Sequence, residues 1–147
     1  MVKLSNFPER LKELMFDHDN IKSELLGAAI GIHGTNVRAW MSGKSLISLE
    51  NAIKLADFFE CRLDYLAGIS ENDEKVILRA LPDFYKNLRS VMEEKGITRY
   101  SLAKKPEIKD VYFTKWSHGA KPDLITVIKL AEYLEVSLDY LVGRADY

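Results

Sequence analysis

The sequence predicts an all-α fold made of two tandem five-helix domains that are joined by a short helical connector. Two observations support this prediction. Apolar residues recur at the three- and four-residue spacing of amphipathic helices, with glycines at the ends of several such stretches. The second half of the chain also repeats the plan of the first half. We expect the first domain at residues 1–69, the connector at residues 70–82 and the second domain at residues 83–147.

Composition excludes several classes of protein. Of the 147 residues, 47% are hydrophobic and 29% charged, which is ordinary for a globular protein. No apolar run approaches the roughly 20 residues that span a bilayer, so we expect a cytoplasmic protein that does not bind membranes. The single cysteine, Cys61, cannot form an internal disulfide, and the three histidines lack the spacing of metal ligands. We therefore expect no metal and no cofactor.

The first helix is predicted by Phe7, Leu11 and Leu14, which share one helical face. Residues 17–20 end this helix. After the glycine at position 43, Ser48 is placed to cap a helix of apolar residues that continues to Phe59. A last short turn of helix with the sequence LDYL, at residues 63–66, completes the five helices.

Residues 21–44 between these elements predict two short helices joined by a tight turn. The first runs from about Lys22 to Ile30, and Gly31 supplies the positive φ that ends it. The second runs from Gly34 to Ser42. Its inward positions are Val37 and Trp40, and its outer positions are Thr35, Asn36, Arg38 and Ala39. This is the layout of a helix-turn-helix whose second helix enters the DNA major groove.

The repeat is visible at corresponding positions of the two halves. Trp40 returns 76 positions later as Trp116, and the LDYL sequence returns 75 positions later at residues 138–141. We expect both tryptophans in the two cores, and Cys61 as a small buried side chain. Between the copies, Ser70 and Asp73 have the spacing of a capping box, which predicts that the connector is a short helix.

Several short sequences are similar to those of a known family. They are LKEL at residues 11–14, EEKGIT at 93–98, SLA at 101–103, SGK at 42–44, KLA at 54–56 and 129–131, and LDYL in both copies. With these sequences the chain resembles the helix-turn-helix domains of the phage repressor and Cro class, often called the XRE family. The resemblance covers nearly the whole chain, twice.

The resemblance implies a recognition helix that begins near Gly34. Ser23, Ser42 and Lys44 match positions that contact phosphates in the family. Thr35 and Ala39, together with Gly34, match positions that read base edges. Because these side chains are short, contact with thymine methyl groups is favoured, and longer reach falls to Asn36 and Arg38. His33, just before the helix, is placed to cap it or to contact a phosphate.

The second copy departs from the family pattern. Pro106 stands where the family has an apolar residue and Glu107 where it has glycine, so we expect the helix from Thr98 to end near Lys105 and the turn to be rebuilt. Asp110 begins the next helix, where its charge repels phosphates. The copy is nevertheless basic, and its candidate DNA-binding residues are Arg99, Lys109, Tyr112, Lys115 and Lys121.

No constellation of residues suggests catalysis, so we do not expect an enzyme. The sequence predicts a sequence-specific, double-stranded DNA-binding transcriptional regulator of repressor type, in which the two domains act as a covalent pseudo-dimer. A homodimer is a further possibility. The alternative is a protein-interaction or dimerisation module in which one or both copies no longer bind DNA. An exposed apolar patch around Val111, Tyr112 and Phe113 would favour that alternative.

Overall fold

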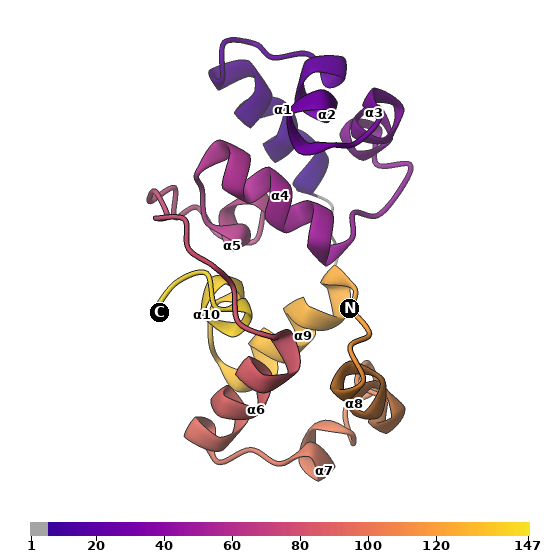
Figure 1. Cartoon of the computed structure of the whole chain (residues 1–147), viewed down its shortest axis with the longest axis vertical. Helices are drawn as coiled ribbons and strands as arrows, with labels where there is room; N and C mark the ends of the chain where they lie inside the picture. Colours follow the sequence, from indigo (N-terminus) through magenta and orange to yellow (C-terminus); the bar gives the residue numbers. More distant parts are fainter. Residues whose placement is uncertain (1–5) are drawn as a thin grey trace. The chain divides into compact units, whose positions relative to one another are not determined.

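The computed structural model describes residues 6–147, and within this range it contains ten helices and no strand (Figure 1). The prediction of an all-α fold is confirmed. The chain divides into two compact units, one ending at Val76 and the other spanning Ile77–Tyr147. We call them domain one and domain two. Residues 1–5, which belong to the predicted first domain, lie outside the described range.

Domain one consists of five helices, as predicted. They are α1 (Phe7–Asp17), α2 (Ser23–Ile30), α3 (Gly34–Ser42), α4 (Leu49–Phe59) and α5 (Leu63–Leu66). The third helix packs against α1 and α2, while α4 contacts α2 and α5. The core between these helices contains Leu11, Leu26, Val37, Leu55 and Leu63, none of which is measurably exposed to solvent. Burial of these side chains supplies the main driving force for the fold.

Domain two repeats the five-helix order. Its helices are α6 (Phe84–Lys95), α7 (Arg99–Leu102), α8 (Asp110–Ser117), α9 (Leu124–Leu134) and α10 (Leu138–Val142). The predicted inward positions are confirmed, because Trp116 is buried here and Trp40 is buried in domain one. Cys61 is also buried, as expected. No helix within residues 6–147 combines the length and the apolar character needed to cross a membrane.

The first helix of each domain is fastened to the fifth by a side chain at the same repeat position. In domain one, the buried guanidinium of Arg10 donates a hydrogen bond to the carbonyl oxygen of Tyr65. In domain two, Asn87 stands 77 positions later and its amide donates to the carbonyl oxygen of Tyr140 at 3.1 Å. The two domains therefore keep one anchoring site with different donors.

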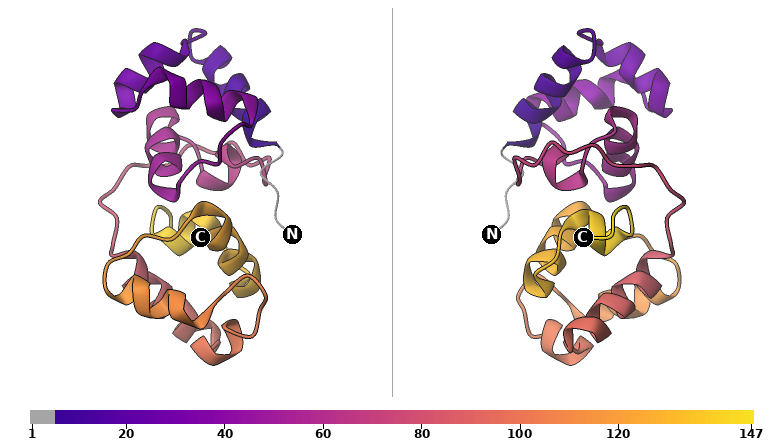
Figure 2. Two further views of the ribbon diagram at one scale, coloured as in Figure 1. Left: turned by 90° about the vertical axis from the view of Figure 1, so that its right-hand side faces the viewer. Right: turned by 90° about the vertical axis from the view of Figure 1, so that its left-hand side faces the viewer.

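The prediction that the connector is helical is wrong. Residues 70–83 contain no helix (Figure 2). The hydroxyl of Ser70 accepts from the amide of Asn72 at 3.1 Å, and the Asn72 side chain accepts from the amide of Glu74 at 3.1 Å. Bonds to an amide two residues ahead form turns that compete with helix. A short helix also needs a packed apolar face, and here Val76 is buried while Ile77 is 89% exposed.

Candidate functional site

The helix-turn-helix of domain one is built around a close approach of α2 to the turn before α3 (Figure 1). Gly31 ends α2 with φ +75°, as predicted, and the amide of Ile32 donates to the carbonyl oxygen of Gly27 at 2.8 Å. A Cβ atom on Gly27 would lie only 2.3 Å from the carbonyl oxygen of Ile32. The turn therefore requires glycine at position 27 and fixes the start of α3.

The outer face of α3 carries the side chains that the sequence placed there. Thr35, Asn36, Arg38 and Ser42 are exposed, and Ala39 is half-buried. Val37 and Trp40 point into the core. Lys44 is exposed just beyond the helix. The face therefore carries mainly short side chains, with two long cationic ones, Arg38 near its middle and Lys44 just beyond its end. Such a surface suits contact with base edges and neighbouring phosphates.

Arg38 is not a free cation on this face. Its guanidinium donates to the hydroxyl of Ser23 at 3.1 Å and forms an ion pair with Glu24, whose carboxylate also accepts from the Ser23 hydroxyl at 3.0 Å. We call these three residues the α2–α3 clamp. The hydrogen bonds from Ser23 and then from Arg38 lower the pKa of Glu24, so it stays ionised at neutral pH.

The α2–α3 clamp limits the access of two predicted DNA-binding residues, Ser23 and Arg38, to DNA. Ser23 is buried, and its hydroxyl faces the other clamp members. Arg38 remains half exposed, so its guanidinium lies at the edge of the recognition face. His33 occupies the N-cap position of α3 with extended backbone and an exposed ring, but its side chain makes no capping hydrogen bond.

In domain two the turn is rebuilt, as predicted. The helix α7 has only four residues and ends at Leu102, earlier than the expected end near Lys105. Proline at position 106 has no N–H to bond back to Leu102, and it disfavours helical backbone at Lys105. Glu107, which replaces the glycine of domain one, does not take positive φ.

The rebuilt turn is held by α9. The hydroxyl of Tyr133 donates to the carboxylate of Glu107, and Lys129 lies 3.9 Å from the same carboxylate. The bond from Tyr133 lowers the pKa of Glu107, and it raises the pKa of Tyr133 to about 12. Glu107 does not adopt the left-handed backbone of Gly31, and its side chain instead secures the turn by contact with α9.

A second clamp joins α7 to α8. The guanidinium of Arg99 forms two bonds with the carboxylate of Asp110, at 2.8 and 3.1 Å, and donates to the hydroxyl of Thr114 at 3.0 Å. We call these residues the α7–α8 clamp. The bonds from Arg99 lower the pKa of Asp110. The charge that the sequence placed against phosphates is therefore balanced within the domain.

The two clamps share two equivalent positions, at which the hydroxyl side chain and the arginine are exchanged, while their acids stand at different positions. Adding 76 to the numbers of Ser23 and Arg38 gives Arg99 and Thr114. In domain one the basic residue lies on the recognition helix, and in domain two it lies on the helix before it. Each domain thus keeps one charged link between the two helices of its motif.

The other candidates of domain two are placed unequally. Lys109, Lys115 and Lys121 are exposed. Tyr112 is half-buried, and its ring centroid lies 5.8 Å from that of Trp116, as in a packing residue. The apolar patch that would favour the protein-interaction alternative is incomplete, because Val111 is 50% exposed while Phe113 is fully buried.

The two clamps are not predicted by the sequence motifs, and neither Glu24 nor Thr114 is among the candidate residues. Their signal is present in the sequence as a comparison between copies: a basic residue moves from position 38 to position 99 while an acid moves from Glu24 to Asp110. Exchange of charge between two helices predicts that the helices face each other at those positions.

Comparison with known proteins gives one result. The sequence model of a protein family described as helix-turn-helix matches the chain twice, at residues 17–66 and 88–141. These ranges include α2 and α3 in domain one and α7 and α8 in domain two. No curated protein and no solved structure gives a significant match.

Proposed function

The chain belongs to the Cro/C1-type (XRE) helix-turn-helix family, and on that premise we propose that it is a sequence-specific transcriptional regulator of repressor type. The family match indicates a DNA-binding regulator with double-stranded DNA as its partner. The proposal adds that domain one reads bases with α3 and that both domains act together as a covalent pseudo-dimer.

One observation carries the proposal for domain one: the regular helix-turn-helix presents an exposed polar row on α3. Thr35 and Asn36 lie in its first turn, where residues of a recognition helix reach base edges. Ser42 and Lys44 follow at its other end, and His33 precedes it, which suits contact with phosphates on either side of the groove. Arg38, at the edge of this row, would then contact a base or a phosphate.

The connector supports joint action of the two domains. Its first part is fastened to domain one, since the amide of Val76 donates to the carbonyl oxygen of Glu60 at 3.2 Å. Its second part is fastened to domain two, since Arg79 donates to the carbonyl oxygen of Arg144 at 3.0 Å. A short tether gives the second domain an effective concentration that reaches the millimolar range.

The decisive experiment is selection of bound fragments from random duplex DNA by the full chain. We expect enrichment of one asymmetric site, because Gly34 and Asp110 begin the two recognition helices and cannot present the same contacts. Binding to the selected site should weaken log-linearly with salt, with a slope of about 0.9 per phosphate contact. No enrichment together with a flat salt profile would remove the DNA-binding proposal.

The pseudo-dimer part has its own test. Fragments 1–76 and 77–147 follow the division into compact units. Each should bind the selected site far more weakly than the full chain, because tethering is lost. If fragment 1–76 alone matches the full chain as a monomer, domain two serves some other partner. If the selected site is palindromic, two chains bind as a homodimer.

A second candidate function for domain two is supported by its exposed apolar side chains. Tyr100 on α7 is 72% exposed and Val111 on α8 is 50% exposed. Exposed aromatic and aliphatic side chains are more typical of a protein contact than of a phosphate contact. Substitution Val111→Lys separates the two functions: it should weaken a protein interface, whereas it should preserve or increase affinity for DNA.

A further inference from the structure

The first part of the connector is held to domain one as far as Val76. The buried guanidinium of Arg10 donates to the carbonyl oxygen of Ser70 at 3.2 Å and pairs with the carboxylate of Glu71 at 2.9 Å. The side chain of Val76 is buried, and its amide donates to the carbonyl oxygen of Glu60 at 3.2 Å. Bonds at both ends therefore fix this part of the connector although it forms no helix.

The second part of the connector is held to domain two, first at Arg79. The guanidinium of Arg79 donates to the carbonyl oxygen of Arg144 at 3.0 Å and forms an ion pair with Asp146, also at 3.0 Å. The next contact is at Pro82, whose Cδ atom would lie 2.4 Å from a Cβ atom on Gly143. The end of the connector thus packs closely on the turn after α10.

The residues that bind Arg79 are themselves anchored. The guanidinium of Arg144 donates to the carboxylate of Asp139, and both side chains are buried. The amides of Arg144 and Ala145 also donate to the carbonyl oxygen of Asp139, at 2.7 and 3.2 Å. Separation of a buried ion pair leaves an uncompensated charge in the core, so this pair holds residues 144 and 145 in place.

Only Ile77 and Leu78 lie between the two fixed parts, and we call them the joint (Figure 2). Within residues 6–147 they make no hydrogen bond or ion pair, and both side chains are exposed. Three peptide units lead from Val76 to Arg79, and they reach at most about 11 Å. If Arg79 is released, the free segment extends to Pro82, and its six units reach about 22 Å.

The contact at Arg79 is the weaker of the two attachments. The side chain of Arg79 is 41% exposed and that of Asp146 is 88% exposed, whereas Arg10 is buried in domain one. Exposed ion pairs contribute little to stability and are screened by salt. Opening at Arg79 therefore leaves the cores of both domains intact.

We propose that Arg79 and residues 144–146 form a latch that sets the reach of the joint. With the latch closed, only Ile77 and Leu78 move freely. With the latch open, the reach grows by about 11 Å, which corresponds to about three base pairs of about 3.4 Å each. On the proposed function, on which this part rests, a closed latch restricts the spacing of the two half-sites and an open latch relaxes it.

The latch itself is tested without DNA, by ¹⁵N relaxation of the full chain. Order parameters should be close to the value of about 0.85 of rigid backbone at Ala80 and Leu81, and below about 0.6 at Ile77 and Leu78. Arg79→Ala should lower the values at Ala80 and Leu81 below about 0.6 and leave those of the ten helices unchanged. Residues 80 and 81 as mobile as the joint in the parent protein, or still rigid in Arg79→Ala, would overturn the proposal.

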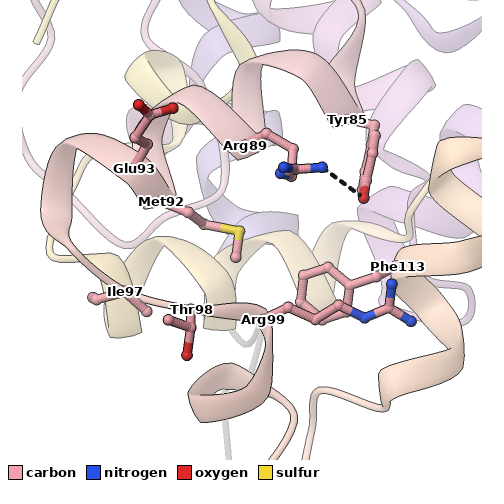
Figure 3. A pocket seen from close by; sticks show the side chains of 8 residues that line it. All are labelled: Tyr85, Arg89, Met92, Glu93, Ile97, Thr98, Arg99 and Phe113. Carbon is pink, nitrogen blue, oxygen red and sulfur yellow. Dashed lines mark hydrogen bonds between the residues drawn. The ribbon is translucent and has the colours of Figure 1, made fainter.

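The matched control is Arg89→Ala, which also removes one arginine from domain two. Arg89 lies on α6, and its only hydrogen bond within residues 6–147 is to the hydroxyl of Tyr85, at 3.4 Å (Figure 3). This variant should leave the order parameters of residues 77–82 unchanged. Equal changes in the two variants would assign the effect to net charge and would contradict the latch.

The consequence for DNA is measured on duplexes in which up to about three base pairs are inserted between the selected half-sites. Arg79→Ala should bind the uninterrupted site about threefold more weakly, because effective concentration falls roughly as the −3/2 power of a doubled tether length. The variant should also lose less affinity on insertion than the parent protein. The same dependence on spacing in both would overturn the role in half-site spacing. If the parent protein selects no DNA site, the proposed function fails, while the relaxation measurement still decides whether the latch exists.

Discussion

Substitution Gly27→Ala tests the packing on which the recognition helix depends. The added methyl group would lie 2.3 Å from the carbonyl oxygen of Ile32, about 1 Å inside a normal contact. That carbonyl cannot easily yield, because the amide of Ile32 is bonded to Gly27 at 2.8 Å. Overpacking of this kind costs about 1–3 kcal/mol or more, while alanine returns about 1 kcal/mol of helix propensity. Because the obstructing atom belongs to the backbone, the upper part of this range, about 2–3 kcal/mol, applies, and we expect a net loss of about 1–2 kcal/mol.

The measurement is urea unfolding of the full chain followed by tryptophan fluorescence. The chain has two tryptophans, one in each domain, so a Trp116→Phe background leaves Trp40 as the reporter for domain one. Gly27→Ala should lower the urea midpoint of domain one without changing its slope. Hydrogen exchange should quicken first in α2 and α3, where the two elements are forced apart.

The repeat supplies the control. Position 103 is the equivalent of position 27, and it is already alanine, so the rebuilt turn of domain two accommodates a Cβ atom there. Ala103→Gly, read from Trp116 in a Trp40→Phe background, should cost no more than about 1 kcal/mol. The reasoning is refuted if Gly27→Ala unfolds at the urea concentration of the parent protein, or if Ala103→Gly proves the more damaging change.

Three further predictions concern binding and pH. Lys44→Ala should reduce the slope of log affinity against log salt by about 0.9 and leave sequence preference unchanged, whereas an unchanged slope would place this side chain off the phosphates. Arg38→Ala should weaken DNA binding by about 1–3 kcal/mol and Lys115→Ala by less, measured by titration on the selected site; the reverse order would make α8 the main reader. Tyr133 has a folded pKa of about 12 against 10.0 for the free side chain, so the stability from its bond to Glu107 is present below pH 10 and is lost as pH rises toward 12. Absorbance titration of tyrosinate should show one group near pH 12 that Tyr133→Phe removes, and its persistence in that variant would contradict the assignment.

The helix-turn-helix of domain one could be predicted closely from the sequence. The signals for α2 and α3 are local: apolar spacing fixes the buried face, and a glycine in the left-handed conformation fixes the boundary at Gly31. Apolar spacing alone indicates that α4 continues to Phe59, since the left-handed residue that follows it is Glu60 and not glycine. Where the backbone preferences of the residues and the spacing of apolar side chains agree, they determine the bounds of a helix with little influence from tertiary contacts.

The connector and the second turn were less predictable because tertiary contacts decide them. Ser70 fits either a helix cap or a turn, and the turn forms because a helix through Ile77 would leave that side chain without a packed face. Pro106 correctly indicated an early end to α7. The replacement contact between Glu107 and Tyr133 joins residues far apart in sequence, so no local pattern reveals it.

The α2–α3 clamp and the α7–α8 clamp affect how strongly each domain is expected to bind DNA. Each domain retains a charged link between the two helices of its motif, but the residue left at the start of the recognition helix differs. In domain one this residue is Gly34, which adds no charge. In domain two it is Asp110, whose carboxylate accepts two hydrogen bonds from Arg99. Breaking this pair would leave the guanidinium without its carboxylate partner. If Arg99 moved to a phosphate, the carboxylate of Asp110 would lose its partner close to the DNA. We therefore expect domain two to contribute less binding free energy than its basic composition suggests. For the proposed pseudo-dimer we therefore expect unequal half-sites, with domain one making the stronger contact with bases.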